Sequence, residues 1–124
     1  MRYVDGFLLV VKKSNVGAYK RLAAKAEKIW REYGALDYKE CVGDDLKAKK
    51  GMGVPFPRQM RTKSGETVFF SYILYKNRAH RDRVNKAIMK DPRVAGLCDP
   101  KKMPFDVKRM CYGGFKVLVD GGRG

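Results

Sequence analysis

The chain has 124 residues, of which 44% are hydrophobic, and its 28 Lys and Arg against 13 Asp and Glu give a net charge of +15. This length suits one domain with one core. The longest apolar run, residues 7–11, is far shorter than the roughly 20 residues of a membrane-spanning helix and too short for a secretory signal. We therefore expect one domain over residues 1–120, a cytoplasmic location with no membrane partner, and a flexible tail at residues 121–124.

The three cysteines, Cys41, Cys98 and Cys111, are odd in number, lie far apart and form no C-x-x-C pair. Such a set predicts neither a disulfide framework nor a zinc site. We expect reduced, mostly structural thiols, no metal and no cofactor.

Residues 3–12 have apolar side chains on both alternating faces, which is typical of a strand buried on two sides. Ser14 or Asn15 is expected to cap the helix that follows, because such side chains accept hydrogen bonds from the first free N–H groups. Apolar residues recur there at spacings of three and four as far as Gly34, which suits a left-handed helix stop. The chain thus begins with a central strand and a helix.

Residues 35–42 alternate between two faces, with Tyr38 and Glu40 on the same one, and predict a partly exposed edge strand. Residues 43–65 contain four glycines, two prolines and many charges, with no helical or strand period. A loop of this length in a compact domain is usually functional or disordered.

Residues 67–75 again carry apolar side chains on both faces, and only Ser71 interrupts them. Asn77 is expected to cap a second helix that runs to about Lys90. The pair Asp91-Pro92 ends it, because the residue before a proline disfavours helical angles.

After a connector, residues 109–119 predict a last strand that the glycines at 113–114 interrupt. The order βαββαβ consists of two right-handed crossover units. It predicts an α+β, ferredoxin-like fold with a four-stranded antiparallel sheet and two helices on one face. Residues 3–12 and 67–75 are central in this fold, which agrees with their apolar faces.

One face of this sheet has no helix to cover it. Apolar side chains of both central strands would lie there in water as a large patch. A second copy of the sheet is the simplest cover, so the sequence predicts a homodimer. Cys41 and Cys111 would lie on opposite edge strands, roughly 14 Å apart, which is too far for a disulfide.

Six segments spread along the chain match a family pattern. They are residues 1–7 (MRYVDGF), 29–36 (IWREYGAL), 75–85 (YKNRAHRDRVN), 89–93 (MKDPR), 103–106 (MPFD) and 112–115 (YGGF). Together they closely resemble the YbaA-like bacterial family of unknown function. The resemblance implies that two copies pair as a dimeric α/β barrel with a cleft between sheet and helices, similar to small cofactor-free monooxygenases, isomerases and haem-degrading enzymes. A fold does not fix a reaction, so whether the chain is an enzyme stays open.

A basic block opens the second predicted helix and consists of Asn77, Arg78, His80 and Arg81. Free N–H groups at a helix start and two guanidinium groups favour an anion such as a carboxylate or phosphate. The alternative is a solvated helix face whose arginines pair with nearby aspartates.

The candidate catalytic residues are His80 and Asp106. His80 is the only histidine, so imidazole proton transfer near neutral pH needs it, with Asp82 or Asp106 as its orienting partner. Trp30 and Tyr112 belong to a set of aromatic residues expected to line an apolar cleft, with ordinary core packing as the alternative.

Two functions follow from these patterns. The first is binding, with or without transformation, of a small anionic metabolite in the cleft, through Asn77, Arg78, His80, Arg81, Trp30 and Tyr112. The alternative is an RNA-associated basic binding protein, because residues 44–65 carry six Lys and Arg against two Asp and residues 76–93 carry seven against two. Such charge binds RNA phosphates without sequence preference.

Overall fold

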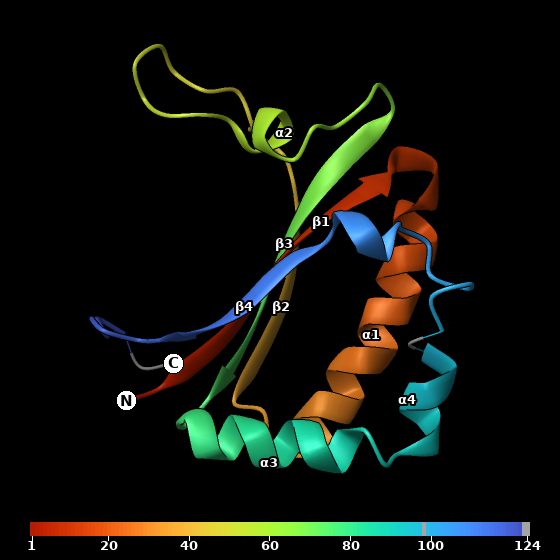
Figure 1. Cartoon of the computed structure of the whole chain (residues 1–124), viewed down its shortest axis with the longest axis vertical. Coiled ribbons are helices and arrows are strands. Elements are labelled where there is room, and N and C mark those ends of the chain that lie inside the picture. Colours follow the sequence, from red (N-terminus) through yellow and green to blue (C-terminus); the bar gives the residue numbers. More distant parts are fainter. Residues whose placement is uncertain (98, 123–124) are drawn as a thin grey trace.

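The structure is a computed structural model that describes residues 1–97 and 99–122, with a four-stranded antiparallel sheet and helices against one side of it (Figure 1). The strands are β1 (Tyr3–Lys12), β2 (Asp37–Val42), β3 (Glu66–Tyr75) and β4 (Cys111–Lys116), in the order β2-β3-β1-β4. The helices are α1 (Val16–Glu32), α2 (Phe56–Gln59), α3 (Arg78–Ile88) and α4 (Pro92–Leu97), and the short 3-10 turns are η1 (Lys13–Asn15) and η2 (Val107–Arg109). The predicted α+β, ferredoxin-like fold is confirmed. Cys98 and the last two residues of the predicted tail lie outside the described residues.

The two long helices begin differently from each other. Asn77 caps α3 as predicted, because its side chain accepts a hydrogen bond of 2.8 Å from the His80 N–H. The predicted side-chain cap of α1 is wrong: η1 precedes the helix, and the Asn15 amide donates instead to the Pro104 carbonyl at 3.3 Å. After α1 the chain turns at Gly34, whose φ of +112° is the left-handed stop that was predicted.

Two segments that the periodicity left without structure contain short helices. Pro92 ends α3 but also begins α4, because proline is well accommodated in the first turn of a helix. The loop of residues 43–65, here called the arm, contains α2, which follows Pro55. Helices this short have too few turns to show a period in sequence.

On the helix side of the sheet, odd-numbered residues of β1 and β3 meet α1. Leu9, Val11 and Phe69 pack against Tyr19 and Ala23 of that helix. A second part of the core, toward α3 and α4, contains Tyr3, Ile29, Ala35, Ile73, Tyr75, Val84, Ile88 and Val94. Burial of this face is what holds the helices to the sheet.

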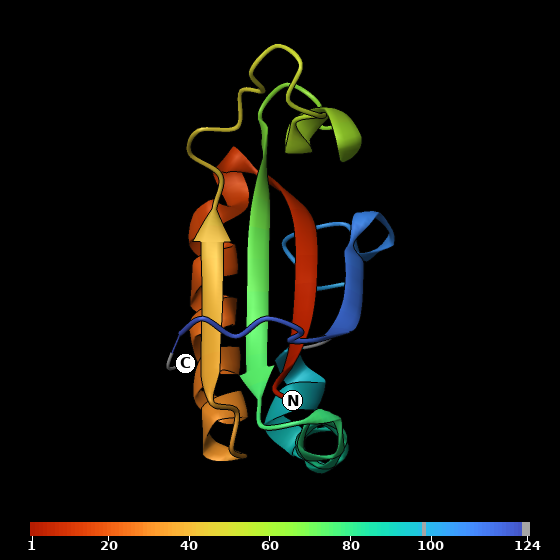
Figure 2. The same cartoon turned by 90° about the vertical axis from the view of Figure 1, so that its left-hand side faces the viewer.

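The other side of the sheet, here called the open face, is turned toward the viewer in Figure 2. The sequence predicted that a second copy of the chain would cover the apolar side chains of this face. For the end of the sheet next to the arm this prediction is wrong. Met60 of the arm covers Val10 and Val68, so the end of the sheet next to the arm is buried within one chain. Phe70 and Phe115 stay 48% and 60% exposed.

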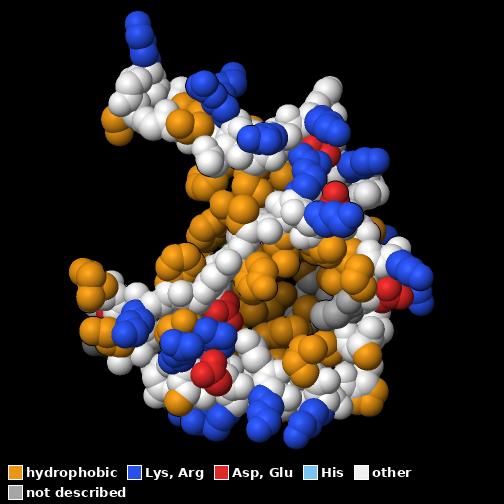
Figure 3. All heavy atoms as spheres, viewed as in Figure 1, with side chains coloured by type: hydrophobic (Ala, Val, Ile, Leu, Met, Phe, Trp, Pro, Cys, Tyr) orange, Lys and Arg blue, Asp and Glu red, His pale blue; other side chains and the backbone are white. Residues whose placement is uncertain are grey.

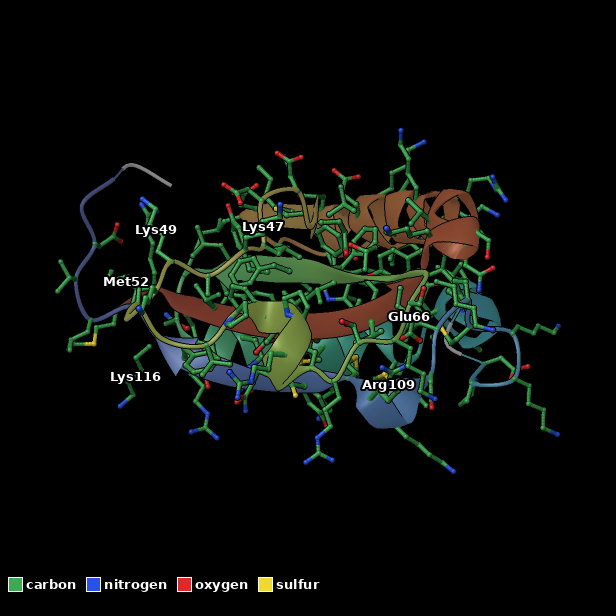
Figure 4. The ribbon with its side chains drawn as sticks, turned by 90° about the horizontal axis from the view of Figure 1, so that it is seen from above. Lys47, Lys49, Met52, Glu66, Arg109 and Lys116 are labelled. Carbon is green, nitrogen blue, oxygen red and sulfur yellow. The ribbon has the colours of Figure 1, made fainter. Side chains whose placement is uncertain are left out.

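One contact lies where the arm joins β3, and another lies where the C-terminal segment leaves β4. Glu66, at the start of β3, accepts hydrogen bonds of 2.7 and 3.0 Å from the Arg109 guanidinium of η2, and the two side chains lie side by side in Figure 4. The Val117 N–H donates to the Arg2 carbonyl at 2.9 Å, after which the chain crosses in front of the open face (Figure 2). The arm and this C-terminal segment therefore stand over opposite ends of the open face (Figure 1).

Among the described residues, no helix has the length and apolar character that a membrane crossing demands. Cys41 and Cys111 are free and exposed on β2 and β4, the two edge strands.

Candidate functional site

The space between the sheet and the helices contains the cavities that best suit a small ligand. One, of about 560 Å³, is lined by α1, β2 and β3, and another, of about 570 Å³, is lined by β1, β3, β4, α1 and α3. A smaller cavity of about 170 Å³ lies between them, since it shares Tyr38 and Glu40 with the first and Phe7 and Trp30 with the second. Figure 3 shows a hollow with hydrophobic walls on this side of the molecule.

A carboxyl group forms the polar centre of the first cavity. Glu40 of β2 turns toward the helix side and lies opposite Ser71 of β3 in the strand register. Its Oε2 accepts hydrogen bonds from the Tyr19 hydroxyl at 2.7 Å and from the Ser71 hydroxyl at 2.6 Å, and its Oε1 accepts from the Tyr38 hydroxyl at 3.4 Å. These four residues are here called the Glu40 site.

Burial decides the protonation chemistry of the Glu40 site. It raises the pKa of the Glu40 carboxyl above its usual 4.5, because the three hydroxyl donors only partly compensate the loss of water. Burial also raises the pKa of the Tyr19 and Tyr38 phenols, and the Glu40 charge adds to this. The phenols therefore keep their protons and act as donors, while Glu40 is the group that titrates.

The second cavity, here called the Arg81 pocket, is lined by Asp5, Phe7, Trp30, Ile73, Arg81, Asn85, Ile88, Met89, Tyr112, Gly113 and Gly114. The Arg81 guanidinium lies 4.9 Å above the Tyr3 ring and donates to the Tyr3 hydroxyl at 3.0 Å. Its Nε lies 3.6 Å from Asp5 and 3.5 Å from Asp82. Arg81 is thus already balanced by two carboxylates.

Two further features define the Arg81 pocket. Burial raises the pKa of Asp5, and the nearby Arg81 charge reverses only part of this increase. Gly114 is required by close packing, because a Cβ at this position would lie 2.7 Å from a ring carbon of Tyr3 and 2.8 Å from the Arg81 Nη2.

The structure brings together three of the six ligand residues predicted from sequence. Arg81, Trp30 and Tyr112 all line the Arg81 pocket. Tyr112 stacks on Phe7 with ring centroids 6.1 Å apart, and Trp30 reaches the pocket from α1.

The other predicted site residues lie outside both large cavities. Asn77 uses its side chain to cap α3, and Arg78 is exposed, 3.9 Å from Asp82. The His80 Nδ1 accepts a hydrogen bond from the Lys76 N–H at 3.0 Å, so neither of the predicted aspartates orients it. Partial burial, with the charges of nearby cations, lowers the pKa of His80.

Asp106, the second catalytic candidate, caps η2 by accepting a 3.0 Å hydrogen bond from the Lys108 N–H. In this structure its side chain holds the turn before β4.

Sequence reasoning missed Glu40, Tyr19 and Ser71 as site residues. The signals were present: Glu40 is an acidic residue on the apolar-facing side of its strand, and Ser71 is the only small polar residue in β3 apart from Thr67 near its start. Their meeting depends on strand register, which no local pattern states. Among the described residues, no group of three or more His, Cys, Asp or Glu side chains is arranged to hold a metal.

Comparison with known proteins shows a family to which this sequence is similar. The profile of the family described as "Protein of unknown function (DUF1428)" matches residues 2–107. "Uncharacterized protein YbaA" of Escherichia coli strain K12 is 39% identical over 120 residues, which cover 97% of this chain and 99% of the relative, and that of Shigella flexneri matches equally. The resemblance seen in the sequence is confirmed.

A similarity to solved structures is weaker. A dimeric ferredoxin-like protein from an uncultured marine organism covers 93% of this chain and 92% of its own, at 12% identity and a TM-score of 0.43. At these values the similarity carries no information about ligand or assembly.

Proposed function

We propose that this chain, which belongs to the DUF1428 family of proteins of unknown function, binds a small, largely apolar organic molecule between its sheet and its helices. One observation carries the proposal: the 560 Å³ cavity has mainly apolar walls, and its few polar groups include the Glu40 carboxyl, which three hydroxyl groups hold in place. A cavity of this size with a few convergent polar groups is the usual form of a small-molecule site.

The cavity can be filled without disturbing the core. Ala24 is exposed on α1 and lines the cavity, so Ala24→Trp would occupy its entrance. Ala18 is also exposed on the same helix and does not line the cavity, so Ala18→Trp is the matched control. A thermal-shift screen with small ketones, lactones, phenols and organic acids is expected to give ligands that stabilise the wild type and Ala18→Trp but not Ala24→Trp. Ligands that stabilise all three proteins equally would place binding elsewhere.

The prediction of an anionic ligand, made from Asn77, Arg78, His80 and Arg81, stays a prediction, and Arg81 is the member of this set that lines a large cavity. An anion would have to replace Asp5 as the partner of Arg81, since that guanidinium already lies between two carboxylates. Asp5→Asn removes this competitor, so it should increase the affinity of carboxylate ligands and leave that of uncharged ligands unchanged. Weaker carboxylate binding by Asp5→Asn would remove Arg81 as the anion contact.

We also propose that a second copy of the chain covers the open face. Hydrophobic side chains gather in the concave side between the arm and the C-terminal segment (Figure 3). The strongly exposed ones are Met52, Val54, Phe56, Phe70, Phe115, Leu118 and Val119. A two-fold pairing lets each copy place its arm against the other, and such closed pairing is the commonest form of homo-oligomer.

The dimer is testable by sedimentation or light scattering over a range of protein and salt concentrations. Phe115→Asp would bury a charge in the interface and should raise the dissociation constant by roughly 100-fold or more, about 3 kcal/mol. Met89 is also apolar and exposed but lies on the helix side, so Met89→Asp is the control and should leave the dimer intact. A wild type that is monomeric at all concentrations would contradict the proposal.

RNA binding is kept as a second candidate because of the arm. All six of its Lys and Arg side chains are exposed and none forms an ion pair among the described residues; Lys47 and Lys49 point outward in Figure 4. RNA affinity should fall steeply with salt, whereas pairing of two copies of charge +15 should strengthen with salt. RNA affinity that does not respond to salt would exclude phosphate contacts by the arm.

A further inference from the structure

The Glu40 carboxyl has one oxygen that is fully engaged and one that is not. Oε2 accepts two short hydrogen bonds, from Tyr19 at 2.7 Å and Ser71 at 2.6 Å. A carboxylate oxygen has two lone pairs, so Oε2 has no further capacity. Within residues 1–97 and 99–122, Oε1 accepts only from Tyr38, at 3.4 Å, which is longer than a normal O–H···O hydrogen bond. The free lone pair of this carboxyl therefore belongs to Oε1.

We propose that Glu40 transfers protons, and that its Oε1 removes and returns a proton on an uncharged carbonyl compound bound in the 560 Å³ cavity. This inference rests on the proposed function, because it requires a small molecule to occupy that cavity. It adds the class of substrate and the class of reaction.

The choice of an uncharged substrate follows from the charges around Glu40. No ion pair balances this carboxylate among the described residues, although Lys20 and Glu27 of α1 line the same cavity. A negatively charged substrate would be repelled, and the apolar walls favour a hydrocarbon body. The raised pKa of Glu40 brings its basicity closer to neutral pH, where a general base is most effective.

Tyr38 is the group suited to stabilise negative charge on the substrate. Its hydroxyl keeps its proton because burial raises its pKa, and its hydrogen bond to Glu40 is long enough to be exchanged for a substrate oxygen. Donors aimed at a developing oxyanion make a large contribution in a site that excludes water.

The step balances without any other reactant. Oε1 takes a proton from the carbon beside a carbonyl group, and the electron pair of the broken C–H bond forms a C=C bond while the carbonyl oxygen becomes an enolate oxygen that accepts from Tyr38. If the substrate has a β,γ double bond, the protonated Glu40 then returns the proton to the γ carbon and the C=O bond forms again. The net change is movement of a double bond into conjugation, and Glu40 ends as it began.

The experiment uses the β,γ-unsaturated isomer of cyclohexenone as the probe. Its conversion to the conjugated isomer is followed by ultraviolet absorbance, and its binding by saturation-transfer NMR, in the full-length protein. Glu40→Gln keeps the size of the side chain and should lower the rate roughly 100-fold or more. Tyr38→Phe should lower it roughly 10- to 100-fold. Asp37→Asn changes a carboxyl of the same strand that accepts from Lys39, Tyr72 and the Tyr38 backbone N–H but from no side chain of the Glu40 site. An Asn side chain keeps an acceptor oxygen for that N–H, so this variant should retain the wild-type rate.

The outcomes separate this inference from the proposed function. A wild type that binds the probe but converts it no faster than buffer, or a Glu40→Gln variant as fast as the wild type, would overturn the proton transfer and leave ligand binding intact. A wild type and Ala18→Trp that bind neither this probe nor any compound of the thermal-shift screen would overturn both. The expected result is conversion by the wild type with a rate that falls as pH is lowered through the Glu40 pKa, and loss of this pH dependence in Glu40→Gln.

Discussion

On the helix side of the sheet, odd-numbered residues of β1 and β3 pack against α1, α3 and α4. This side also contains the two large cavities, one with the Glu40 carboxyl and the other with the Arg81–Asp5 ion pair. On the open face, the even-numbered residues of the same two strands pack against the arm at one end of the sheet and are exposed farther along it. Both faces come from the same two strands. Their difference shows that an apolar strand surface becomes core, ligand site or interface according to what crosses over it.

The largest expected effect is a loss of folding stability, and it should differ between the core on the helix side and the exposed part of the open face. Ile88 is 0% exposed, and Ile88→Ala should lower the free energy of unfolding by about 2–5 kcal/mol. Phe115 is 60% exposed, so in an isolated monomer Phe115→Ala should lower the free energy of unfolding by much less than Ile88→Ala does. Urea unfolding at several protein concentrations measures both. A large, concentration-dependent loss in Phe115→Ala would show that the open face is buried by a partner.

The next prediction concerns how firmly the arm is held. Met60 is 8% exposed and packs on Val10 and Val68, so Met60→Ala should cost about 2 kcal/mol or more. Met52, 73% exposed on the same arm, is the control, and Met52→Ala should have no effect on unfolding of the monomer. If Met60→Ala were also neutral in urea unfolding, the arm would contribute nothing to the fold.

Two adjacent glycines of β4 test the two faces within one strand. A Cβ at Gly114 would overlap Tyr3 and Arg81 on the helix side, so Gly114→Ala should cost about 1–3 kcal/mol. A Cβ at Gly113 would meet only the Phe115 ring, 3.8 Å away, on the open face. Gly113→Ala should therefore be neutral or slightly stabilising in thermal unfolding. Equal losses for both variants would contradict the close packing at Gly114.

The smallest expected effect is a difference in pH dependence. The folded state binds the Glu40 proton more tightly than the unfolded chain does, so ionisation of Glu40 lowers stability as pH rises above its usual pKa of 4.5. Glu40→Gln should therefore gain thermal stability relative to wild type as pH increases, with no difference below that value.

The control for this pH effect is a carboxyl with the opposite sign. Arg109 lowers the pKa of Glu66 to about 2, so this carboxylate stabilises the fold above its usual pKa and the contribution disappears as pH falls. Glu66→Gln should be less stable than wild type at neutral pH, and the gap should close in acid. The same trend for Glu40→Gln and Glu66→Gln in thermal melts would mean that burial does not control the Glu40 proton.

The sequence by itself determined the order of the four strands and the two long helices, and which strands are central. Alternating apolar residues in two strands, the repeat of α1 and the cap at Asn77 are local signals, and each acts within a few residues of where it is read. The sequence predicted six ligand residues for one cleft, and the structure brings three of them, Arg81, Trp30 and Tyr112, to the Arg81 pocket.

Only the tertiary structure decided how the polar side chains are used. Asn77, His80 and Asp106 proved to hold local turns, since their nearest donors are backbone N–H groups a few residues away. Glu40 gained its role from Tyr19 and Ser71, residues of two other elements that meet it through helix packing and strand register. A sequence pattern states which face a side chain occupies, but the partner across the core is fixed only when the elements pack.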